Sequence, residues 1–379
     1  MLKRIKGKLD LIVEKSFKQR AFRASAAAER NALVNARECL RRPLTMKSNP
    51  VRVRLELTNA CNLNCVFCYR PHFSTRDRSL LTPEHVERLA PILRTAKFVS
   101  LSQKAEPLAS PHFIKVLEKV SVYKPICSLY TNGQLLSREI SEALVKNRVH
   151  FVTVSLSAYG DKYARLHRGG RFDKLVSNIK TLNEIKKRRR SVFPRLRISF
   201  VLRPDTVEFL EDAVRFAKEY KFSEGVQLLS FFRFTDEDKS MEPALNWRKY
   251  EGAVRSFRAL AEREGVMLDS ALDVEDGMRS AVVSEYAARC YEPWESYNVT
   301  PGGSVLPCTQ AGAVMSNMIT GDPLAIWNNK KFQAYRSHMT CRPFNRDCLE
   351  CWHCRYVSPL VTGKKAARLD RIFDTFHRR

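Results

Sequence analysis

The sequence contains no long apolar run, and this absence limits where the protein can work. No stretch of its 379 residues approaches the roughly 18 apolar residues that a membrane-spanning helix needs. The N-terminal segment also lacks the uninterrupted apolar core of a secretory signal peptide. We therefore expect a cytoplasmic protein, and structural disulfides are rare in that compartment. The eleven cysteines of the chain then point to metal or redox chemistry.

Acidic residues are scarce relative to basic ones. The chain has 40 Asp and Glu against 66 Lys and Arg, a net charge of +26. An excess of this size favours a nucleic acid, an anionic membrane surface or a phosphorylated substrate, and a basic solubilising surface is the alternative. The sequence shows no RNA-binding module with interleaved aromatic residues, which argues against nucleic acid.

Internal repeats and low-complexity tracts are also absent, and the N-terminal segment has a helical composition. Residues 1–49 predict a helical arm, because an alanine-rich stretch with high helix propensity follows an apolar patch around Leu11. Lysines surround this patch, so a helix lying on a membrane surface is one interpretation. An arm packed on the rest of the protein is the alternative that we favour.

A strand–helix alternation fills the next part of the chain. Short apolar or β-branched segments with helical stretches between them predict parallel strands covered on both faces. The six predicted strands are residues 51–57, 97–102, 126–131, 151–157, 196–202 and 226–232. The expected fold class is α/β, a partial (β/α)6 TIM-type barrel with the N-terminal helical arm and a small cysteine-rich C-terminal domain. Functional residues should then lie at the carboxyl ends of the strands.

Composition sets the remaining domain boundaries. Residues 50–235 form the predicted barrel, and a charged segment over 236–289 predicts a helical linker. Six of the eleven cysteines fall between Cys290 and Cys354, so residues 290–379 predict a second, metal-bearing domain. Cys39 and Cys127 stand alone. We interpret both as structural, with Cys127 directed toward the helices by strand alternation.

Three cysteines directly follow the first predicted strand. Cys61, Cys65 and Cys68 have C-x3-C-x2-C spacing in a loop rich in asparagine. Three thiolates can bind three irons of a cubic cluster and leave the fourth iron open, whereas a structural zinc site would want four ligands. The strand, the loop and Phe67 resemble the radical S-adenosylmethionine (SAM) superfamily. The resemblance implies a [4Fe-4S] cluster at these cysteines whose open iron holds SAM. A zinc knuckle is the alternative.

The resemblance also implies a set of SAM-binding residues at successive strand ends. Glu106 and Pro107 match the end of the family's Gly-Gly-Glu-Pro segment, although Lys104 and Ala105 replace its glycines. Glu106 is expected to meet the SAM ammonium and Arg168 the SAM carboxylate, since a guanidinium pairs a carboxylate in two places. The full set of predicted cofactor-binding residues is Glu106, Thr131, Asn132, Ser155, Ser157, Arg168 and Arg203.

The C-terminal cysteines resemble the SPASM/Twitch extension of radical SAM enzymes. The Gly303-to-Cys308 step and the segment from Leu324 to Asn328 match its pattern. Six cysteines are too few for two fully ligated cubanes, so we expect one auxiliary [4Fe-4S] cluster, with tetrahedral zinc as the alternative. The preferred ligands are Cys290, Cys308, Cys348 and Cys351, with Cys354 competing for either of the last two positions. Cys341 is then a spare thiol that could donate hydrogen to a substrate radical.

The family resemblance implies a radical enzyme. An electron donor such as flavodoxin or ferredoxin would reduce the first cluster, SAM would yield a 5′-deoxyadenosyl radical, and the radical would abstract hydrogen from the substrate. We predict a small polar substrate such as a sugar, aminocyclitol or nucleotide-linked sugar, with oxidation or epimerisation as the outcome. The basic charge of the chain fits an anionic group on this substrate. A peptide- or protein-modifying SPASM enzyme is the alternative. A non-catalytic zinc and nucleic-acid-binding protein is the second alternative.

Overall fold

The computed structural model describes six segments of the chain, residues 24–68, 78–102, 104–230, 247–270, 290–309 and 312–339. No helix within these ranges is long and apolar enough to cross a membrane. The described part of the N-terminal arm contains one helix, α2 (Ala26–Arg41), with Ser25 as its N-cap. The rest of the predicted arm, residues 1–23, lies outside the described part.

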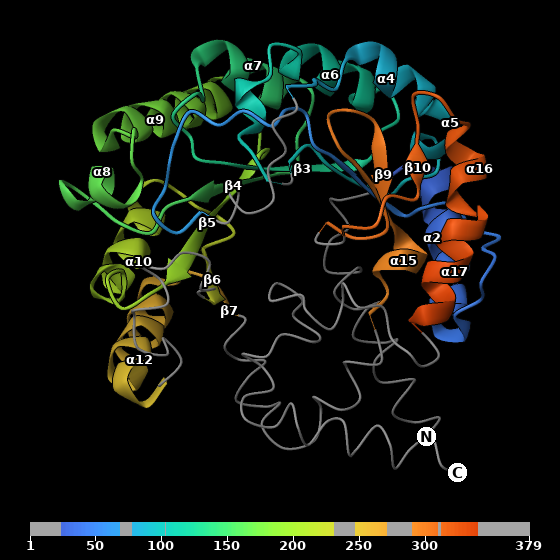
Figure 1. The fold of residues 1–379 in the computed structure, drawn as a ribbon. Coiled ribbons are helices and arrows are strands. Elements are labelled where there is room, and N and C mark those ends of the chain that lie inside the picture. The colour runs from blue at the N-terminus through green and yellow to red at the C-terminus, as the bar shows by residue number, and fades with distance from the viewer. Residues whose placement is uncertain are drawn as a thin grey trace.

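A single curved sheet organises the described residues (Figure 1). Its strand order is β10-β9-β8-β1-β2-β3-β4-β5-β6-β7. Strands β1 to β7 and the β1–β8 pair are parallel, whereas β9 and β10 continue antiparallel. The strands are β1 (Arg52–Leu55), β2 (Phe98–Ser100), β3 (Ile126–Thr131), β4 (Phe151–Ser155), β5 (Arg195–Leu202), β6 (Val226–Ser230), β7 (Leu268–Ser270), β8 (Ser296–Val299), β9 (Ser304–Leu306) and β10 (Ser316–Asn317).

Helices cover the convex face of this sheet (Figure 1). Several begin at a side-chain N-cap, as the sequence predicts: the Ser137 hydroxyl accepts a hydrogen bond from the backbone N–H of Ile140 at the start of α7. The remaining helical segments are α4 (Pro83–Arg88), α5 (Ala90–Leu93), η1 (Pro107–Ala109), α6 (Phe113–Ser121), α7 (Arg138–Lys146), α8 (Lys162–Leu166), α9 (Phe172–Arg188), η2 (Val207–Phe209), α10 (Leu210–Glu219), α12 (Trp247–Glu264), α15 (Glu292–Glu295), α16 (Pro323–Trp327) and α17 (Lys330–His338).

The two faces of the sheet differ in chemistry because side chains alternate along each strand. The face toward the helices is apolar and belongs to the main core, with Leu55, Leu129 and Ile198 fully buried. The concave face carries polar side chains and one small apolar cluster around Ile126. There the Tyr130 hydroxyl on β3 lies 3.4 Å from the Gln227 Oε1 on β6, so the two side chains meet across the intervening strands. Polar groups such as these are suited to bind a polar cofactor or substrate.

The six predicted strands are all present, and the α/β, partial TIM-type fold is confirmed. Cys127 lies in the apolar core between sheet and helices, as predicted. Two features were not predicted. Strand β7 extends the sheet after β6, and the C-terminal segment continues the same sheet, because β8 pairs in parallel with β1.

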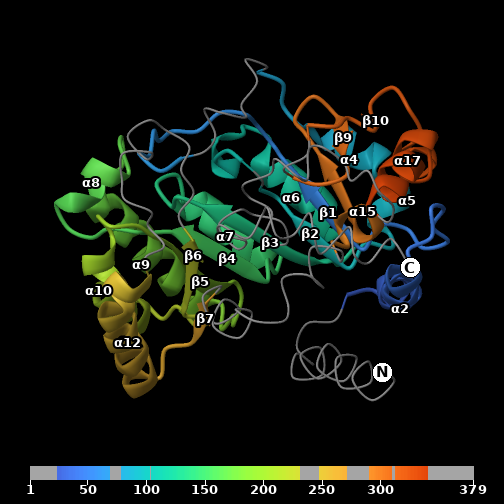
Figure 2. The same ribbon diagram turned by 60° about the horizontal axis from the view of Figure 1, so that its bottom comes forward.

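The C-terminal segment packs at the β1 end of the sheet beside α2, whereas α10 and α12 cover the β5–β7 end (Figures 1 and 2). Trp294 and Trp327 are almost fully buried there. The Asn35 amide of α2 donates a hydrogen bond to the Trp294 carbonyl at 2.7 Å. The Trp327 indole N–H donates to the Ser48 carbonyl at 2.9 Å. These contacts join the N-terminal arm to the C-terminal segment.

Candidate functional site

The three cysteines of the first motif lie in the loop after β1, at the carboxyl end of the parallel strands, where such folds place their functional residues. Cys61, Cys65 and Cys68 are all half-buried thiols. The Cys68 N–H donates to the Cys65 carbonyl at 3.1 Å, which makes a tight turn between these two cysteines.

The loop that follows β4 holds the cysteine loop in place. The Asn64 N–H donates to the Arg168 carbonyl at 2.9 Å, and the Val66 N–H donates to the Leu166 carbonyl at 3.0 Å. Arg168 therefore contacts the cysteine loop through its backbone, while its side chain is exposed. The predicted contact of that side chain with the SAM carboxylate stays a prediction.

Glu106 contacts two of the other predicted site residues, Thr131 and Asn132. Its carboxylate accepts hydrogen bonds from the Thr131 hydroxyl at 2.8 Å, the Asn132 N–H at 2.7 Å and the Leu108 N–H at 3.1 Å. Its own N–H donates to the Ala60 carbonyl at 3.2 Å, next to Cys61. Burial raises the pKa of Glu106 to about 7, although these hydrogen bonds oppose the shift. Glu106 thus braces the turn after β3 against the cysteine loop, and its contact with the SAM ammonium stays a prediction.

Asn132 lies in the turn after β3, and its side chain faces the cysteine loop. Its amide donates to the Asn62 side-chain oxygen at 2.9 Å and lies 3.9 Å from the Cys61 sulfur. Gly133 follows with φ +75°, and a side chain there would collide with Leu175, so this tight turn requires glycine. The turn is therefore built to hold Asn132 against the first cysteine.

The residues predicted at the ends of β4 and β5 differ in what their side chains contact. Ser155 is half-buried at the end of β4. The Ser157 hydroxyl accepts a hydrogen bond from the Val201 N–H at 2.9 Å and so links β4 to β5. The Arg203 side chain is buried and pairs with Asp205 through two contacts, at 2.8 and 3.1 Å. Its guanidinium also lies over the Phe67 ring, 5.9 Å from the centroid, which places it next to the cysteine loop.

His167 is a site residue that the sequence prediction missed. Its Nδ1 lies 3.7 Å from the Cys65 sulfur, and its Nε2 accepts a hydrogen bond from the Ser157 N–H at 3.2 Å. The side chain is fully buried. No spacing rule could connect His167 with a cysteine 102 positions earlier in the chain.

Glu56 is a second residue that the prediction missed. It is 4% exposed, and its Oε1 has no hydrogen-bond partner among the described residues. Burial raises its pKa from the ordinary 4.5 to about 7, although Lys104 opposes the shift through its charge and a backbone hydrogen bond. An orphaned buried oxygen beside the cysteine loop is what a site built for an additional polar group would leave. The signal was available in the sequence, because Arg52, Arg54 and Glu56 alternate with apolar residues along one face of the strand.

Replacing Glu56 by Gln should make folding less sensitive to pH. Because the pKa of the folded protein lies above that of the unfolded chain, wild-type stability should fall as the pH rises from about 4.5 to about 7. Glu56→Gln removes this titration, so its unfolding free energy should exceed the wild-type value by up to about 3 kcal/mol at pH 8. Urea unfolding at a series of pH values measures the difference. If the unfolding free energies of wild type and Glu56→Gln differ by the same amount at every pH, the raised pKa of Glu56 is contradicted.

The second group of cysteines begins where the C-terminal segment packs against β1. Cys290 is buried just before α15, and Cys308 is half-buried after β9. The other four predicted members, Cys341, Cys348, Cys351 and Cys354, lie outside the described residues. Strands β8 and β9 form an antiparallel hairpin between Cys290 and Cys308.

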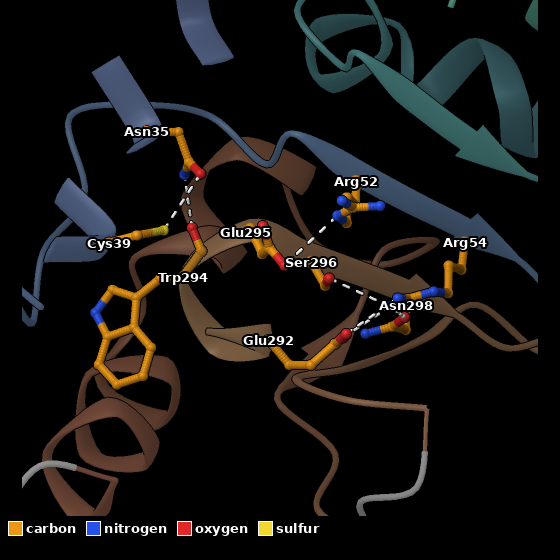
Figure 3. Close-up of polar contacts among 9 residues, drawn as sticks. All are labelled: Asn35, Cys39, Arg52, Arg54, Glu292, Trp294, Glu295, Ser296 and Asn298. Carbon is orange, nitrogen blue, oxygen red and sulfur yellow. Dashed lines mark hydrogen bonds and ion pairs between the residues drawn. The ribbon is translucent and has the colours of Figure 1, made fainter. Parts of the chain in front are cut away.

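An ion pair fixes the start of this segment against the barrel (Figure 3). The Arg54 guanidinium donates to both oxygens of Glu292 at 2.7 and 3.0 Å. It also donates to the Ser296 hydroxyl at 3.2 Å and the Asn298 side-chain oxygen at 3.0 Å, both on β8. Cys290, two residues before Glu292, is thereby held beside the strand that leads into the first cysteine loop.

The donor set of the first motif suits an iron–sulfur cluster. Thiolates are the ordinary ligands of such clusters. Among the residues that the structure describes, no group of three or more His, Cys, Asp or Glu side chains is arranged to hold a single metal ion. A cubane places each thiolate on a different iron, so its three cysteines need not converge on one point. The three half-buried thiols on one loop, with the orphaned Glu56 oxygen beside it, fit a cluster that carries a polar ligand.

Two protein-family models match the chain. Residues 55–217 match the radical SAM superfamily, and residues 290–355 match SPASM, an iron–sulfur cluster-binding domain. These matches imply a SAM-binding [4Fe-4S] cluster, SAM itself and auxiliary iron–sulfur ligation in the C-terminal part.

Three relatives illustrate the range of similar sequences. The uncharacterized protein MJ0804 of Methanocaldococcus jannaschii is 32% identical over 130 residues, 33% of this chain, and the match spans only 41% of that protein. A probable GTP 3′,8-cyclase of the same organism is 24% identical over 265 residues, 68% of this chain and 84% of the cyclase. The PqqA peptide cyclase of Rhodopseudomonas palustris is 25% identical over 353 residues, 86% of this chain and 90% of that enzyme.

Two solved structures share the fold over most of the chain. SuiB of Streptococcus suis bound to precursor peptide SuiA has a TM-score of 0.62 and 19% identity, covering 86% of this chain and 74% of SuiB. The protein anSMEcpe with bound AdoMet and the Kp18Cys peptide has a TM-score of 0.57 and 15% identity, covering 86% of this chain and 99% of anSMEcpe. At these identities the likeness establishes a common fold.

Proposed function

Because this chain is a member of the radical SAM superfamily with a C-terminal SPASM domain, we propose that it is an enzyme that modifies a peptide or protein substrate. When bound, the first cluster and SAM supply reductive SAM cleavage and, from it, hydrogen abstraction from carbon. The chain itself must position SAM and substrate at the carboxyl ends of the strands and exclude water from them.

The observation that carries the peptide proposal is the fold shared with SuiB, which holds its precursor peptide, over 86% of this chain. The anSMEcpe structure also contains a peptide, and the PqqA peptide cyclase is similar over 86% of this chain. This support favours the peptide alternative over the sugar, aminocyclitol or nucleotide-linked sugar predicted from the sequence. The polar concave face that bears Tyr130 and Gln227 offers hydrogen-bonding groups for a peptide backbone.

We propose that Cys61, Cys65 and Cys68 hold the SAM-binding cluster. The polar groups of SAM would then lie among the predicted residues at the strand ends. Asn132 and Glu106 position the loop, as their contacts indicate. Ser155, Ser157, Thr131, Arg168 and Arg203 complete the proposed set.

For the C-terminal part we propose one auxiliary cluster. Its ligands would be Cys290, Cys308, Cys348 and Cys351, with Cys354 as the competitor for either of the last two positions. Cys341 keeps its proposed role as a spare thiol and hydrogen donor. Replacing Cys341 by Ala separates the roles, because loss of a donor stops product formation with full iron, whereas loss of a ligand costs iron.

A substrate survey tests the proposal. Anaerobically reconstituted protein with SAM and dithionite should release 5′-deoxyadenosine faster in the presence of a peptide encoded beside its gene. The peptide should change mass, and that change should require SAM. Release stimulated only by a sugar or a nucleotide would contradict the peptide assignment while leaving the radical SAM assignment intact.

An anionic small molecule is the second candidate substrate. The net charge of +26 favours it, and so does the similarity to a probable GTP 3′,8-cyclase over 68% of this chain. GTP should therefore be tested as a separate candidate substrate in the same survey. A covalent change in GTP with no change in any peptide would favour this candidate.

A further inference from the structure

We propose that His167 is a positioning residue that donates a hydrogen bond from Nδ1–H to the Cys65 sulfur and thereby raises the reduction potential of the SAM-binding cluster. The inference rests on the proposed cluster ligation by Cys65. Neither the cysteine spacing typical of the family nor the predicted SAM contacts assign a role to His167.

The hydrogen bonds around the ring fix the tautomer. The Ser157 backbone N–H lies 3.2 Å from His167 Nε2. A backbone N–H can only donate, so Nε2 must carry a lone pair. The proton of the neutral ring then sits on Nδ1, which lies 3.7 Å from the Cys65 sulfur. A buried ring whose Nε2 carries a lone pair holds a single proton and is neutral.

Packing holds the ring in this orientation. Tyr163 stacks on one face with ring centroids 4.5 Å apart, and Phe67 meets the imidazole edge-on at 5.2 Å. A side chain at Gly170 would come within 2.8 Å of the Tyr163 ring and 3.0 Å of the His167 carbonyl. The chain therefore needs glycine there to keep Tyr163 and His167 together. Phe67 belongs to the cysteine loop itself, so the ring and the loop are packed as one unit.

The chemical consequence follows from charge. An iron-bound thiolate carries more negative charge when its cluster is reduced, so a donor N–H stabilises the reduced state more than the oxidised state. Partners of this kind, one step beyond the ligands, tune metal centres in general. The His167 N–H should therefore make the cluster easier to reduce.

Three variants test the inference in the full-length holoprotein. His167→Phe keeps an aromatic ring against Tyr163 but removes both nitrogens. His167→Asn restores a donor near the position of Nδ1. Tyr163→Phe is the matched control, because it keeps the stacked ring and removes only the hydroxyl that contacts Gln134 at 3.2 Å.

The readout is the midpoint potential of the cluster whose EPR signal changes when SAM is added. We expect a more negative potential for His167→Phe at unchanged iron content, a return toward the wild-type value for His167→Asn, and the wild-type value for Tyr163→Phe. A wild-type potential in iron-replete His167→Phe would overturn the inference, as would an equal shift in Tyr163→Phe.

A measurement on wild-type protein keeps the inference testable if His167→Phe takes up no iron. Protein labelled with ¹⁵N-histidine should show a weak nitrogen coupling to the reduced SAM-binding cluster in pulsed EPR. Absence of that coupling would refute the hydrogen bond. Protein without any SAM-responsive cluster would instead refute the proposed function, so the two failures are distinguishable.

Discussion

Replacing Cys61, Cys65 and Cys68 together by Ala should abolish SAM cleavage and leave about four irons per chain, as a single auxiliary cubane with four protein thiolates requires. The cysteine loop is held by backbone hydrogen bonds from Asn64 and Val66, which the substitutions do not remove. The fold should therefore survive the loss of the cluster. Iron analysis and 5′-deoxyadenosine release measure the two effects.

Cys39→Ala is the matched control for the triple variant. Cys39 is a buried thiol on α2 that lies 3.4 Å from the Asn35 side-chain oxygen, outside both cysteine groups. Its replacement should leave iron content and SAM cleavage at wild-type values. Full turnover in Cys65→Ala would contradict the assignment of the first cluster to Cys61, Cys65 and Cys68. Roughly eight irons in the triple variant would contradict the single auxiliary cluster, and zinc in place of iron would contradict its iron–sulfur nature.

Local patterns in the sequence were enough to predict the barrel strands and the position of the first motif. Segments such as residues 126–131 and 151–157 are apolar or β-branched and end in polar turns, so both the strands and their functional ends are encoded within a few residues. The turn at Thr131–Gly133 follows the same logic. The sequence placed this turn at the functional edge of the sheet because parallel strands end there together, whereas its contact with the cysteine loop is a finding of the structure.

Contacts between distant segments could not be inferred in this way. Strand β7 is a three-residue segment, Leu268–Ser270, with only one strongly apolar residue, so periodicity gives no signal. The pairing of β8 with β1 depends on tertiary packing and on the Arg54–Glu292 ion pair, whose partners are 238 positions apart. The contact between His167 and Cys65 is equally non-local. These long-range contacts complete the site that the local motifs begin.

Nothing in the sequence marks Arg336 as important for stability. We nevertheless expect its replacement to lower the free energy of unfolding more than any other single substitution. Arg336 is fully buried on α17. Its guanidinium donates to the carbonyls of Pro293 at 2.9 Å, Leu44 at 2.8 Å and Trp327 at 2.9 Å. It also lies over the Trp327 ring, 4.4 Å from the centroid. One side chain therefore joins the N-terminal arm, α15 and α16.

Arg336→Met should lower the free energy of unfolding by about 3–5 kcal/mol, because each buried carbonyl that loses its donor costs about 1–3 kcal/mol. Arg336→Lys should recover only part of the loss, since an ammonium cannot reproduce the planar fork. Arg215→Met is the control. Arg215 is exposed on α10 and pairs with Glu211 at 2.7 Å, so its loss should cost less than about 1 kcal/mol. Urea unfolding of the anaerobic holoprotein, followed by circular dichroism, gives the free energy of unfolding of all three variants. Equal losses for Arg336→Met and Arg215→Met would show that Arg336 does not hold the N-terminal arm, α15 and α16 together.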